Sequence, residues 1–259
     1  MSAAMGTAPA GPTVLERCRT GIEGLDNILD GGIPRGNTVL VSGSCGTGKT
    51  TLSLEYLVRG ALAGERCLFL SVTEASRKIL QNLATFEFFD PRTVEERKLV
   101  FIDVPILYEK LGLSKEELSS EDVNLLVLAI SRLASDMGVQ RLVLDSITSV
   151  CYRIRHEENI RDLILKLGKS LSDISCTTLL VSEIGPAENR YSLYGVEEAI
   201  ADGVILLGNQ QRRGDLLRTL KIIKMRGTTH SRAQYVIDLT PLGILLAPFL
   251  KGGRSGDGL

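Results

Sequence analysis

A glycine-rich segment between an apolar run and an amphipathic stretch constrains the fold of this chain most strongly. Residues 43–50 read GSCGTGKT and match the pattern GxxxxGK[ST] at every fixed position. The apolar run 38–42 predicts a strand before the segment, and residues 49–63 predict a helix after it. Glycines let backbone N–H groups wrap around phosphate oxygens, and the positive end of the following helix adds to the attraction. The segment therefore predicts a phosphate-binding loop; an ordinary glycine-rich turn leaves Lys49 and Thr50 unexplained.

This loop carries the residue types that hold a nucleoside triphosphate. Lys49 supplies a positive charge for the β- and γ-phosphates, and the Thr50 hydroxyl can ligate Mg²⁺. ATP and Mg²⁺ are therefore the expected cofactors. Cys45 is interpreted as a small tolerated side chain, with an oxidation-sensitive thiol as the alternative. The residues assigned to nucleotide binding here are Gly43, Ser44, Cys45, Gly46, Thr47, Gly48, Lys49, Thr50 and Thr51.

Short apolar runs alternate with longer amphipathic stretches along most of the chain. Such alternation predicts an α/β fold with a mostly parallel central sheet flanked by helices. The last three apolar runs are separated only by short turns and predict an antiparallel C-terminal extension. We expect one domain over residues 13–250, a flexible leader over 1–12 and a flexible tail over 251–259. The further predicted strands are 67–72, 99–104, 142–145, 178–182, 204–207, 219–225, 235–239 and 243–246, and the further predicted helices are 76–86, 121–137 and 160–174.

Two carboxylates follow predicted strands at the edge of the sheet where ligands bind. Asp145 ends the run 142–145, and an Asp at this place holds Mg²⁺ in enzymes with such a loop. The alternative role is a helix cap. Glu74 follows the run 67–72 and can act as a general base toward water. A Glu placed there only to favour a helix N-terminus explains it equally well from the residues alone.

Composition and charge exclude several classes of protein. Lys and Arg number 30 and Asp and Glu 31, so the net charge of −1 gives no overall attraction to nucleic acid or an anionic membrane. The five cysteines form no CxxC pair and the two histidines offer no metal cluster, which argues against a zinc site and a disulfide framework. No signal peptide or membrane-length apolar run is present. We predict a reduced, cytoplasmic protein with no membrane partner.

Four further segments, together with the loop, resemble the KaiC-like branch of the RecA-like ATPases. The resemblance spans about residues 17–246 and is most specific at the KMRGTTH stretch. The segments are TGIEGLD at 20–26 with GGIPRG at 31–36, LVLDSITSV at 142–150, GVEEAIADGV at 195–204 and KMRGTTH at 224–230. The resemblance implies a ring, usually a hexamer, with ATP between neighbouring subunits.

In that resemblance, residues of one subunit complete the site of the next. Lys224 and Arg226 match positions that reach the γ-phosphate from the neighbour, and Thr228 and His230 match positions that line the same nucleotide. Glu74 matches a carboxylate that activates water, so the catalytic set becomes Glu74, Lys49, Arg226 and Lys224. The chain departs from the family at Ala75, where a second glutamate is usual. Turnover is therefore expected to be slow.

We weigh three functions. The first is a slow ATPase whose nucleotide state controls a protein partner of unknown identity. The second is a DNA-dependent recombination or repair ATPase resembling RadA, which the cations between Arg212 and Arg232 suggest; the absence of an aromatic stacking set makes nucleic acid the less favoured partner. The third is a non-hydrolysing nucleotide sensor, with autokinase activity at Ser192 as a minor variant. Glu183 and Asn189, in the segment 183–192, are expected near the active face, as a sensor element or a pore loop.

Overall fold

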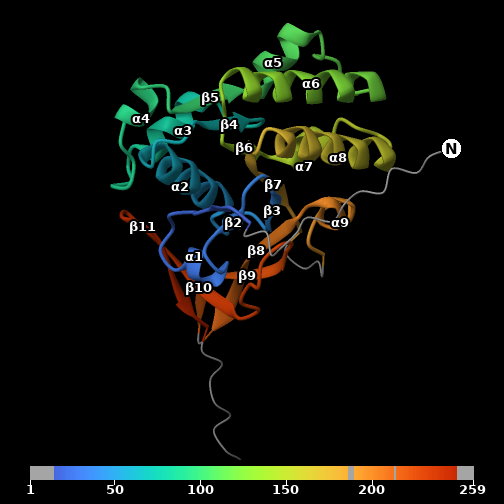
Figure 1. Cartoon of the computed structure of the whole chain (residues 1–259). Helices are drawn as coiled ribbons and strands as arrows, with labels where there is room; N and C mark the ends of the chain where they lie inside the picture. Colours follow the sequence, from blue (N-terminus) through green and yellow to red (C-terminus); the bar gives the residue numbers. More distant parts are fainter. Residues whose placement is uncertain (1–14, 186–189, 213, 250–259) are drawn as a thin grey trace, which may run out of the picture.

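The computed structural model describes residues 15–185, 190–212 and 214–249 (Figure 1). The strands are β1 (Arg17–Cys18), β2 (Ile33–Pro34), β3 (Thr38–Gly43), β4 (Cys67–Ser71), β5 (Leu99–Asp103), β6 (Arg141–Asp145), β7 (Thr177–Glu183), β8 (Gly203–Arg212), β9 (Asp215–Met225), β10 (Gln234–Thr240) and β11 (Gly243–Pro248). The helices are α1 (Leu25–Ile28), α2 (Lys49–Leu62), α3 (Ser76–Leu83), α4 (Arg92–Glu95), α5 (Val104–Leu111), α6 (Ser120–Asp136), α7 (Ile147–Cys151), α8 (Glu157–Asp173) and α9 (Glu197–Ile200). The predicted leader and tail and Asn189 lie outside the described residues.

The central sheet has nine strands in the order β11-β10-β9-β8-β3-β7-β6-β4-β5. From β8 to β5 every neighbouring pair is parallel, whereas β8 to β11 pair antiparallel. This confirms the predicted α/β class, with a mostly parallel sheet and an antiparallel C-terminal extension. The carboxyl ends of β3, β7, β6 and β4 therefore lie side by side at one edge of the sheet, where ligands bind in folds of this kind.

Helices cover both faces of the sheet, and each face has its own hydrophobic cluster (Figure 1). On one face, α1, α2 and α3 pack against side chains such as Val41 and Phe69. On the other, α5, α6, α7 and α8 pack against side chains such as Leu40 and Leu68. Because neighbouring residues of a strand point to opposite faces, the fully apolar runs seen in the sequence are what a doubly covered sheet requires.

The observed elements extend beyond the apolar runs where strands pair outside the core. β8 continues through polar residues to Arg212 because it pairs with β9 from Gly203↔Met225 to Arg212↔Asp215. Exposed strand ends of this kind carry no apolar signal. α5 begins where the predicted strand 99–104 was expected to end, since Pro105 in its first turn favours a helix start. Within the described residues, no helix is both long enough and apolar enough to cross a bilayer.

Candidate nucleotide site

The glycine-rich loop forms a tight turn from β3 into α2. Gly46 and Gly48 have φ angles of 76° and 97°, which residues with a Cβ rarely adopt. At Gly43, a Cβ would approach the Leu207 carbonyl oxygen to 2.5 Å. α2 begins at Lys49, so its N-terminal N–H groups point into the turn. The local sequence thus produces the predicted phosphate-binding geometry.

The side chains of Lys49 and Thr50 are held inside this turn. The Lys49 ammonium donates to the Ser44 carbonyl oxygen at 2.9 Å, and only 6% of Lys49 is exposed. Burial lowers the pKa of Lys49, and the nearby charges of Glu183 and Asp145 oppose that shift. The Thr50 hydroxyl donates to Asp145 Oδ2 at 2.7 Å. The predicted phosphate ligand and the two predicted Mg²⁺ ligands are therefore brought together.

The sheet order places two carboxylates, Glu183 and Asp145, near Lys49. Glu183 lies at the end of β7, opposite Gly43 of β3, and Asp145 lies at the end of β6 opposite Val181. Burial raises the pKa of Asp145, and Glu183 and Glu74 raise it further, while Thr50 and Lys49 act in the opposite direction. Ionising Asp145 in the isolated chain therefore costs free energy. A cation bound beside the carboxylate would lower that free-energy cost.

The loop borders a cavity of about 300 Å³. Besides loop residues, the cavity is lined by Glu183 and by Leu239 of β10, and a Cβ at Gly48 would lie 3.4 Å from Leu239. Arg218 of β9 donates through Nε to the Gly46 carbonyl oxygen at 3.0 Å. No specific role for Leu239 or Arg218 is predicted from the sequence, because only the folding of the C-terminal strands brings them to the loop.

The donor set suits Mg²⁺ bound together with phosphates. Mg²⁺ is usually held by one or two carboxylates, waters and substrate phosphates rather than by a full set of protein ligands. Thr50 and Asp145 supply one hydroxyl and one carboxylate within hydrogen-bond distance of each other. The described part of the chain contains no group of three His, Cys, Asp or Glu residues fit to hold a metal. Such a cation would therefore need the phosphates as additional ligands.

Glu74, the predicted general base, lies three residues beyond β4. Its carboxylate forms an ion pair with Lys78 at 3.0 Å, one turn along α3, and the Glu74 side chain is 34% exposed. The backbone carbonyl of Glu74 accepts a hydrogen bond from Ser71 at the end of β4. The carboxylate is thus anchored close to the ligand edge of the sheet. In the structure, Lys78 engages Oε1 of this carboxylate.

Lys224 and Arg226 lie at the opposite edge of the sheet. Lys224 Nζ donates to the carbonyl oxygens of Ala201 and Glu198 at 2.6 and 3.1 Å. Arg226 Nη1 donates to the Ile200 carbonyl oxygen at 3.2 Å and to Asp202 at 3.1 Å. Both cations thereby cap the carboxyl end of α9, where the helix dipole favours positive charge.

Asp202 ties this pair of cations to the amino end of β3. Its Oδ2 accepts from the backbone N–H of Thr38, the first residue of β3, at 3.0 Å. The phosphate-binding loop follows the last residue of the same six-residue strand. At about 3.3 Å per residue, the strand separates the two groups by roughly 20 Å. The chain therefore does not bring Lys224 and Arg226 to its own loop.

Thr228 and His230 lie on the segment that follows Arg226. The Thr228 hydroxyl donates to the Leu29 carbonyl oxygen at 3.0 Å, beside α1. His230 Nδ1 is 3.1 Å from the Ser231 carbonyl oxygen. These two residues also lie apart from the loop of their own chain, together with the Lys224–Arg226 pair.

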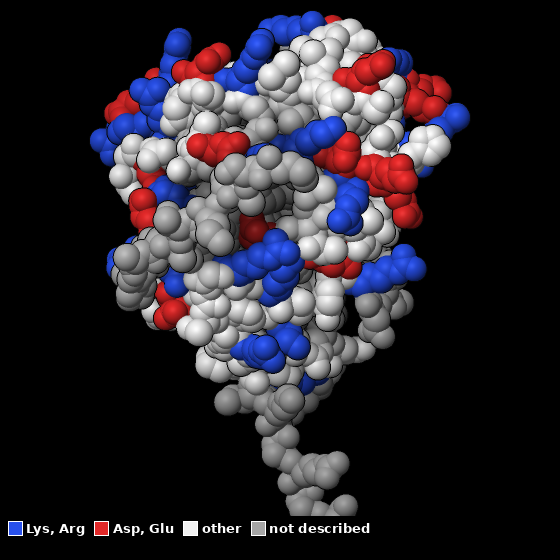
Figure 2. Space-filling model, turned by 45° about the vertical axis from the view of Figure 1, so that its right-hand side comes forward, with Lys and Arg blue, Asp and Glu red and all other residues white. Residues whose placement is uncertain are grey.

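The cations between Arg212 and Arg232 are divided among separate sites. Arg218 contacts the phosphate-binding loop, Lys224 and Arg226 cap α9, and Arg212 lies over the Phe249 ring at 5.2 Å. Figure 2 shows basic and acidic side chains interspersed over the upper part of one face of the molecule. The described cations of the basic stretch are therefore divided among at least three separate sets of contacts.

A family model described as "ATPase: KaiC" matches residues 18–250. The chain belongs to the KaiC ATPase family. It is 36% identical over 250 residues to a UPF0273 protein of Pyrococcus furiosus, covering 93% of this chain and 98% of the relative. It is 32% identical over 235 residues to the circadian clock oscillator protein KaiC of Synechococcus elongatus, covering 90% of this chain and 44% of KaiC.

The crystal structure of a KaiC-like protein from Pyrococcus horikoshii is similar as well. It superimposes with a TM-score of 0.77 at 34% identity, and the match covers 91% of this chain and all of that one. Membership in the KaiC family, together with this match, confirms a RecA-like fold with a nucleotide-binding loop. The loop, Asp145 and the Lys224–Arg226 segment all lie within the matched residues.

Proposed function

We propose that this KaiC-family protein is a Mg²⁺-dependent ATPase that forms a ring with ATP at the subunit interfaces. One observation carries the proposal: the loop and the Lys224–Arg226 pair lie at opposite edges of a single sheet. A site that uses both needs two copies of the chain. Head-to-tail contacts between identical subunits close into rings when the rotation permits, which supports a ring, usually a hexamer in the resembling proteins.

Within one subunit, the loop binds and orients the triphosphate. Its backbone N–H groups and Lys49 hold the phosphates, and Thr50 and Asp145 hold Mg²⁺. When bound, Mg²⁺ would neutralise negative charge on the triphosphate. Glu74 accepts a proton from the attacking water once its carboxylate leaves Lys78. Ala75 supplies no second carboxylate, so we expect slow turnover.

From the neighbouring subunit, Lys224 and Arg226 stabilise the charge that develops on the transferred phosphoryl group. Burial lowers the pKa of Lys224, and the adjacent Arg226 guanidinium lowers it further. The carbonyl oxygens of α9 hold both side chains in place before ATP arrives. Donors held in this way need little rearrangement in the transition state, which is the main source of electrostatic catalysis. Thr228 and His230 would line the same nucleotide.

The test is phosphate release from ATP and Mg²⁺ by the full chain, compared with Glu74→Gln and run with and without single-stranded DNA. We expect turnover that disappears in Glu74→Gln and is indifferent to DNA. Native mass measurements with and without ATP test the ring. Turnover that appears only with DNA would replace this proposal with a repair ATPase; unchanged turnover in Glu74→Gln would remove the assigned base.

Slow hydrolysis suits a protein whose nucleotide state controls a protein partner. The described cations between Arg212 and Arg232 are divided among separate contacts, so a protein is favoured over nucleic acid as the partner. Ser192 is fully buried and donates to the Glu198 carboxylate. A phosphate on that hydroxyl would be buried beside a carboxylate, and autokinase activity at Ser192 is therefore left out of the proposed function.

One specific observation favours the second candidate, a nucleotide sensor without hydrolysis. The Glu74 carboxylate is paired with Lys78, which competes with any proton it would accept. Lys78→Ala separates the two candidates. In an ATPase the variant should release phosphate at least as fast as the wild type, whereas a sensor should release none in either form.

A further inference from the structure

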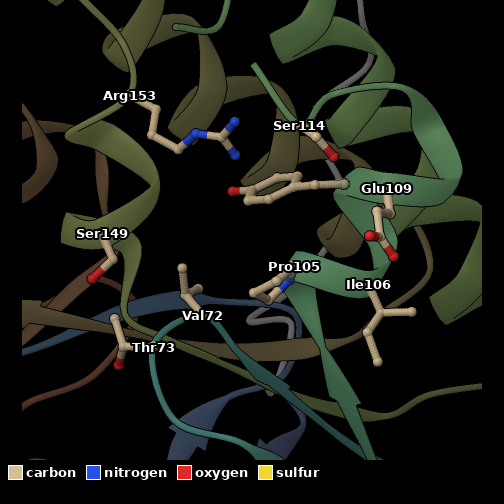
Figure 3. Close-up of a pocket in the computed structure, with 9 residues that line it drawn as sticks. Val72, Thr73, Pro105, Ile106, Glu109, Ser114, Ser149 and Arg153 are labelled. Carbon is tan, nitrogen blue, oxygen red and sulfur yellow. The ribbon is translucent and has the colours of Figure 1, made fainter. Parts of the chain in front are cut away.

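A second cavity, larger than the one beside the loop, borders the segment that leads from β4 to Glu74. Its volume is about 680 Å³, and none of its lining residues borders the nucleotide cavity. It lies between α5, α7 and the segment that follows β4, and Figure 3 shows its lining side chains. Cavities of 300–1,000 Å³ typically bind small organic molecules. The lining residues are Val72, Thr73, Pro105, Ile106, Tyr108, Glu109, Ser114, Ser149 and Arg153.

Arg153 is the one cation among the lining residues of this cavity, and contacts within the protein hold its guanidinium in place before any ligand binds. Its Nη2 donates to the carbonyl oxygens of Leu113 and Lys115, and its guanidinium lies 4.3 Å from the centre of the Tyr108 ring. No carboxylate of the described residues lies within salt-bridge distance of it. Its Nε and Nη1 donate to no described residue. A half-buried guanidinium with unused donors is a ready acceptor for an anionic group.

Apolar and hydroxyl groups complete the lining. Val72, Pro105 and Ile106 provide apolar surface, and the Ile106 side chain is 51% exposed. Tyr108 is 5% exposed, and burial raises the pKa of its hydroxyl while the nearby Arg153 guanidinium lowers it. The two groups do not reach standard hydrogen-bond geometry, and the buried hydroxyl has no other partner in the described structure. A buried polar group without a partner is uncommon and costs free energy. A ligand that reaches this hydroxyl would satisfy it.

The charges limit the ligand to a single negative group. Figure 3 shows Arg153 and Glu109 on opposite sides of the cavity. An anion beside Arg153 gains an ion pair, whereas a second anionic group would meet Glu109 and be repelled. A nucleotide or another polyanion therefore fits poorly. We propose that this cavity is a binding site for a small organic monoanion with an apolar body, such as an aromatic or branched carboxylate.

Two hydrogen bonds and one peptide bond connect this cavity to the nucleotide site. The backbone N–H of Val72 donates to the Asp145 carbonyl oxygen at 2.8 Å, and Thr73 directly precedes Glu74. The Ser149 hydroxyl lies 2.8 Å from that of Ser146, the residue after Asp145. An occupant of the cavity thus touches both segments that carry the proposed base and the Mg²⁺ ligand. The inference therefore extends to regulation, and this part rests on the proposed function. A ligand in the cavity changes the affinity for ATP, and ATP changes the affinity for that ligand.

The probe for the test is 1-anilinonaphthalene-8-sulfonate, a monoanion with an aromatic body whose fluorescence rises on binding. Titrated into the nucleotide-free full chain, it should bind at one site per chain. Arg153→Gln should weaken binding at least 5-fold, and so should Ile106→Glu, which adds a carboxylate at an exposed lining position without touching the contacts of Arg153. Glu109→Gln should tighten binding about 2-fold because a like charge is removed.

Two matched controls make the result specific. Glu95→Gln removes an exposed carboxylate of α4, on the other face of the sheet, and should leave binding unchanged. The neutral analogue N-phenyl-1-naphthylamine should bind at least 10-fold more weakly than the sulfonate. Equal binding of the two probes, or equal binding of the sulfonate by wild type, Arg153→Gln and Ile106→Glu, would overturn the site.

The regulatory part has its own readout, which does not depend on turnover. Mg²⁺ and ATP should shift the affinity of wild type for the sulfonate at least 2-fold, and Lys49→Ala should bind the sulfonate normally but lose that shift. An unchanged affinity in a chain shown separately to bind ATP would overturn the coupling. A chain that binds the sulfonate but no ATP would instead count against the proposed function.

Discussion

The two edges of the central sheet are built in different ways. At the carboxyl edge, eight consecutive residues make the phosphate-binding loop, and its shape follows from glycines at positive φ and the start of α2. At the amino edge, Lys224 and Arg226 take their positions from carbonyl groups of α9 and from Asp202, segments more than twenty residues away. The first edge is a property of local sequence, and the second exists only in the folded chain.

This difference explains why the two edges are suited to different tasks. A backbone cradle binds phosphate in any single subunit, because its donors are N–H groups of one turn. Side chains that cap a helix at the far edge act on a nucleotide only when a second subunit presents its loop to them. Binding should thus belong to the chain and hydrolysis to the assembly, and the following variants test that division.

The largest effect is expected at the loop itself. Lys49→Ala removes the buried ammonium that contacts the Ser44 carbonyl oxygen, and ATP affinity should fall about 10²-fold or more because the triphosphate loses its closest cation. Equilibrium titration with a fluorescent ATP analogue measures this. Lys98→Ala, at an exposed lysine near β5, is the control and should bind normally. Wild-type affinity in Lys49→Ala would mean that the loop is not the phosphate site.

Arg226→Ala should separate hydrolysis from binding. We expect ATP affinity within about 3-fold of wild type, and turnover lower by about 10²-fold or more, in the range by which an arginine finger acts. Mixing Arg226→Ala with Lys49→Ala subunits should restore part of the turnover, since some interfaces then pair an intact loop with an intact Arg226. Turnover at the wild-type level in Arg226→Ala alone would contradict a site shared between two subunits.

The same contrast shows how much of the molecule the sequence predicts. The loop, the buried parallel strands and Asp145 at the end of β6 were all predicted, because each depends on residues that are close in the chain. The contacts of Arg218 and Leu239 with the loop were not, since they depend on how β9 and β10 fold across the sheet edge. Nor was the cavity beside Arg153, which is lined by segments far apart in sequence.

Two Asp→Asn variants, one at each edge of the sheet, should change the Tm in opposite directions. Burial raises the pKa of Asp145, so the ionised carboxylate destabilises the folded chain at pH 7. Asp145→Asn should therefore raise the Tm of the nucleotide-free chain by about 2 °C. The same variant should weaken Mg²⁺-dependent ATP binding. The gain should shrink as the pH falls toward and below about 4, where Asp145 is protonated in both the folded and unfolded chain.

Asp202→Asn is the matched substitution at the amino edge. Asp202 accepts hydrogen bonds from the Thr38 backbone N–H and from the Arg226 guanidinium. In Asp202→Asn, the amide NH₂ would face one of these two donors and could not accept its hydrogen bond. The Tm should therefore fall at pH 7, by a few degrees for a loss of about 1–2 kcal/mol. Thermal unfolding of both variants from pH 4 to pH 8 checks the pair. A lower Tm in Asp145→Asn at pH 7 would contradict the assigned effect of burial.

The smallest effect is expected at Arg218, where the C-terminal strands meet the loop. Its single hydrogen bond to the Gly46 carbonyl oxygen is exposed, and such a bond contributes about 0.5–1.5 kcal/mol. Arg218→Gln should therefore raise the KM for ATP about 2- to 10-fold and leave kcat within about 2-fold, because the contact shapes the loop and not the transition state. Lys221→Gln, on the same strand, is the control and should change neither constant. A drop in kcat at unchanged KM would instead place Arg218 among the groups that act on the transferred phosphate, and the division between a binding edge and a catalytic edge would no longer hold.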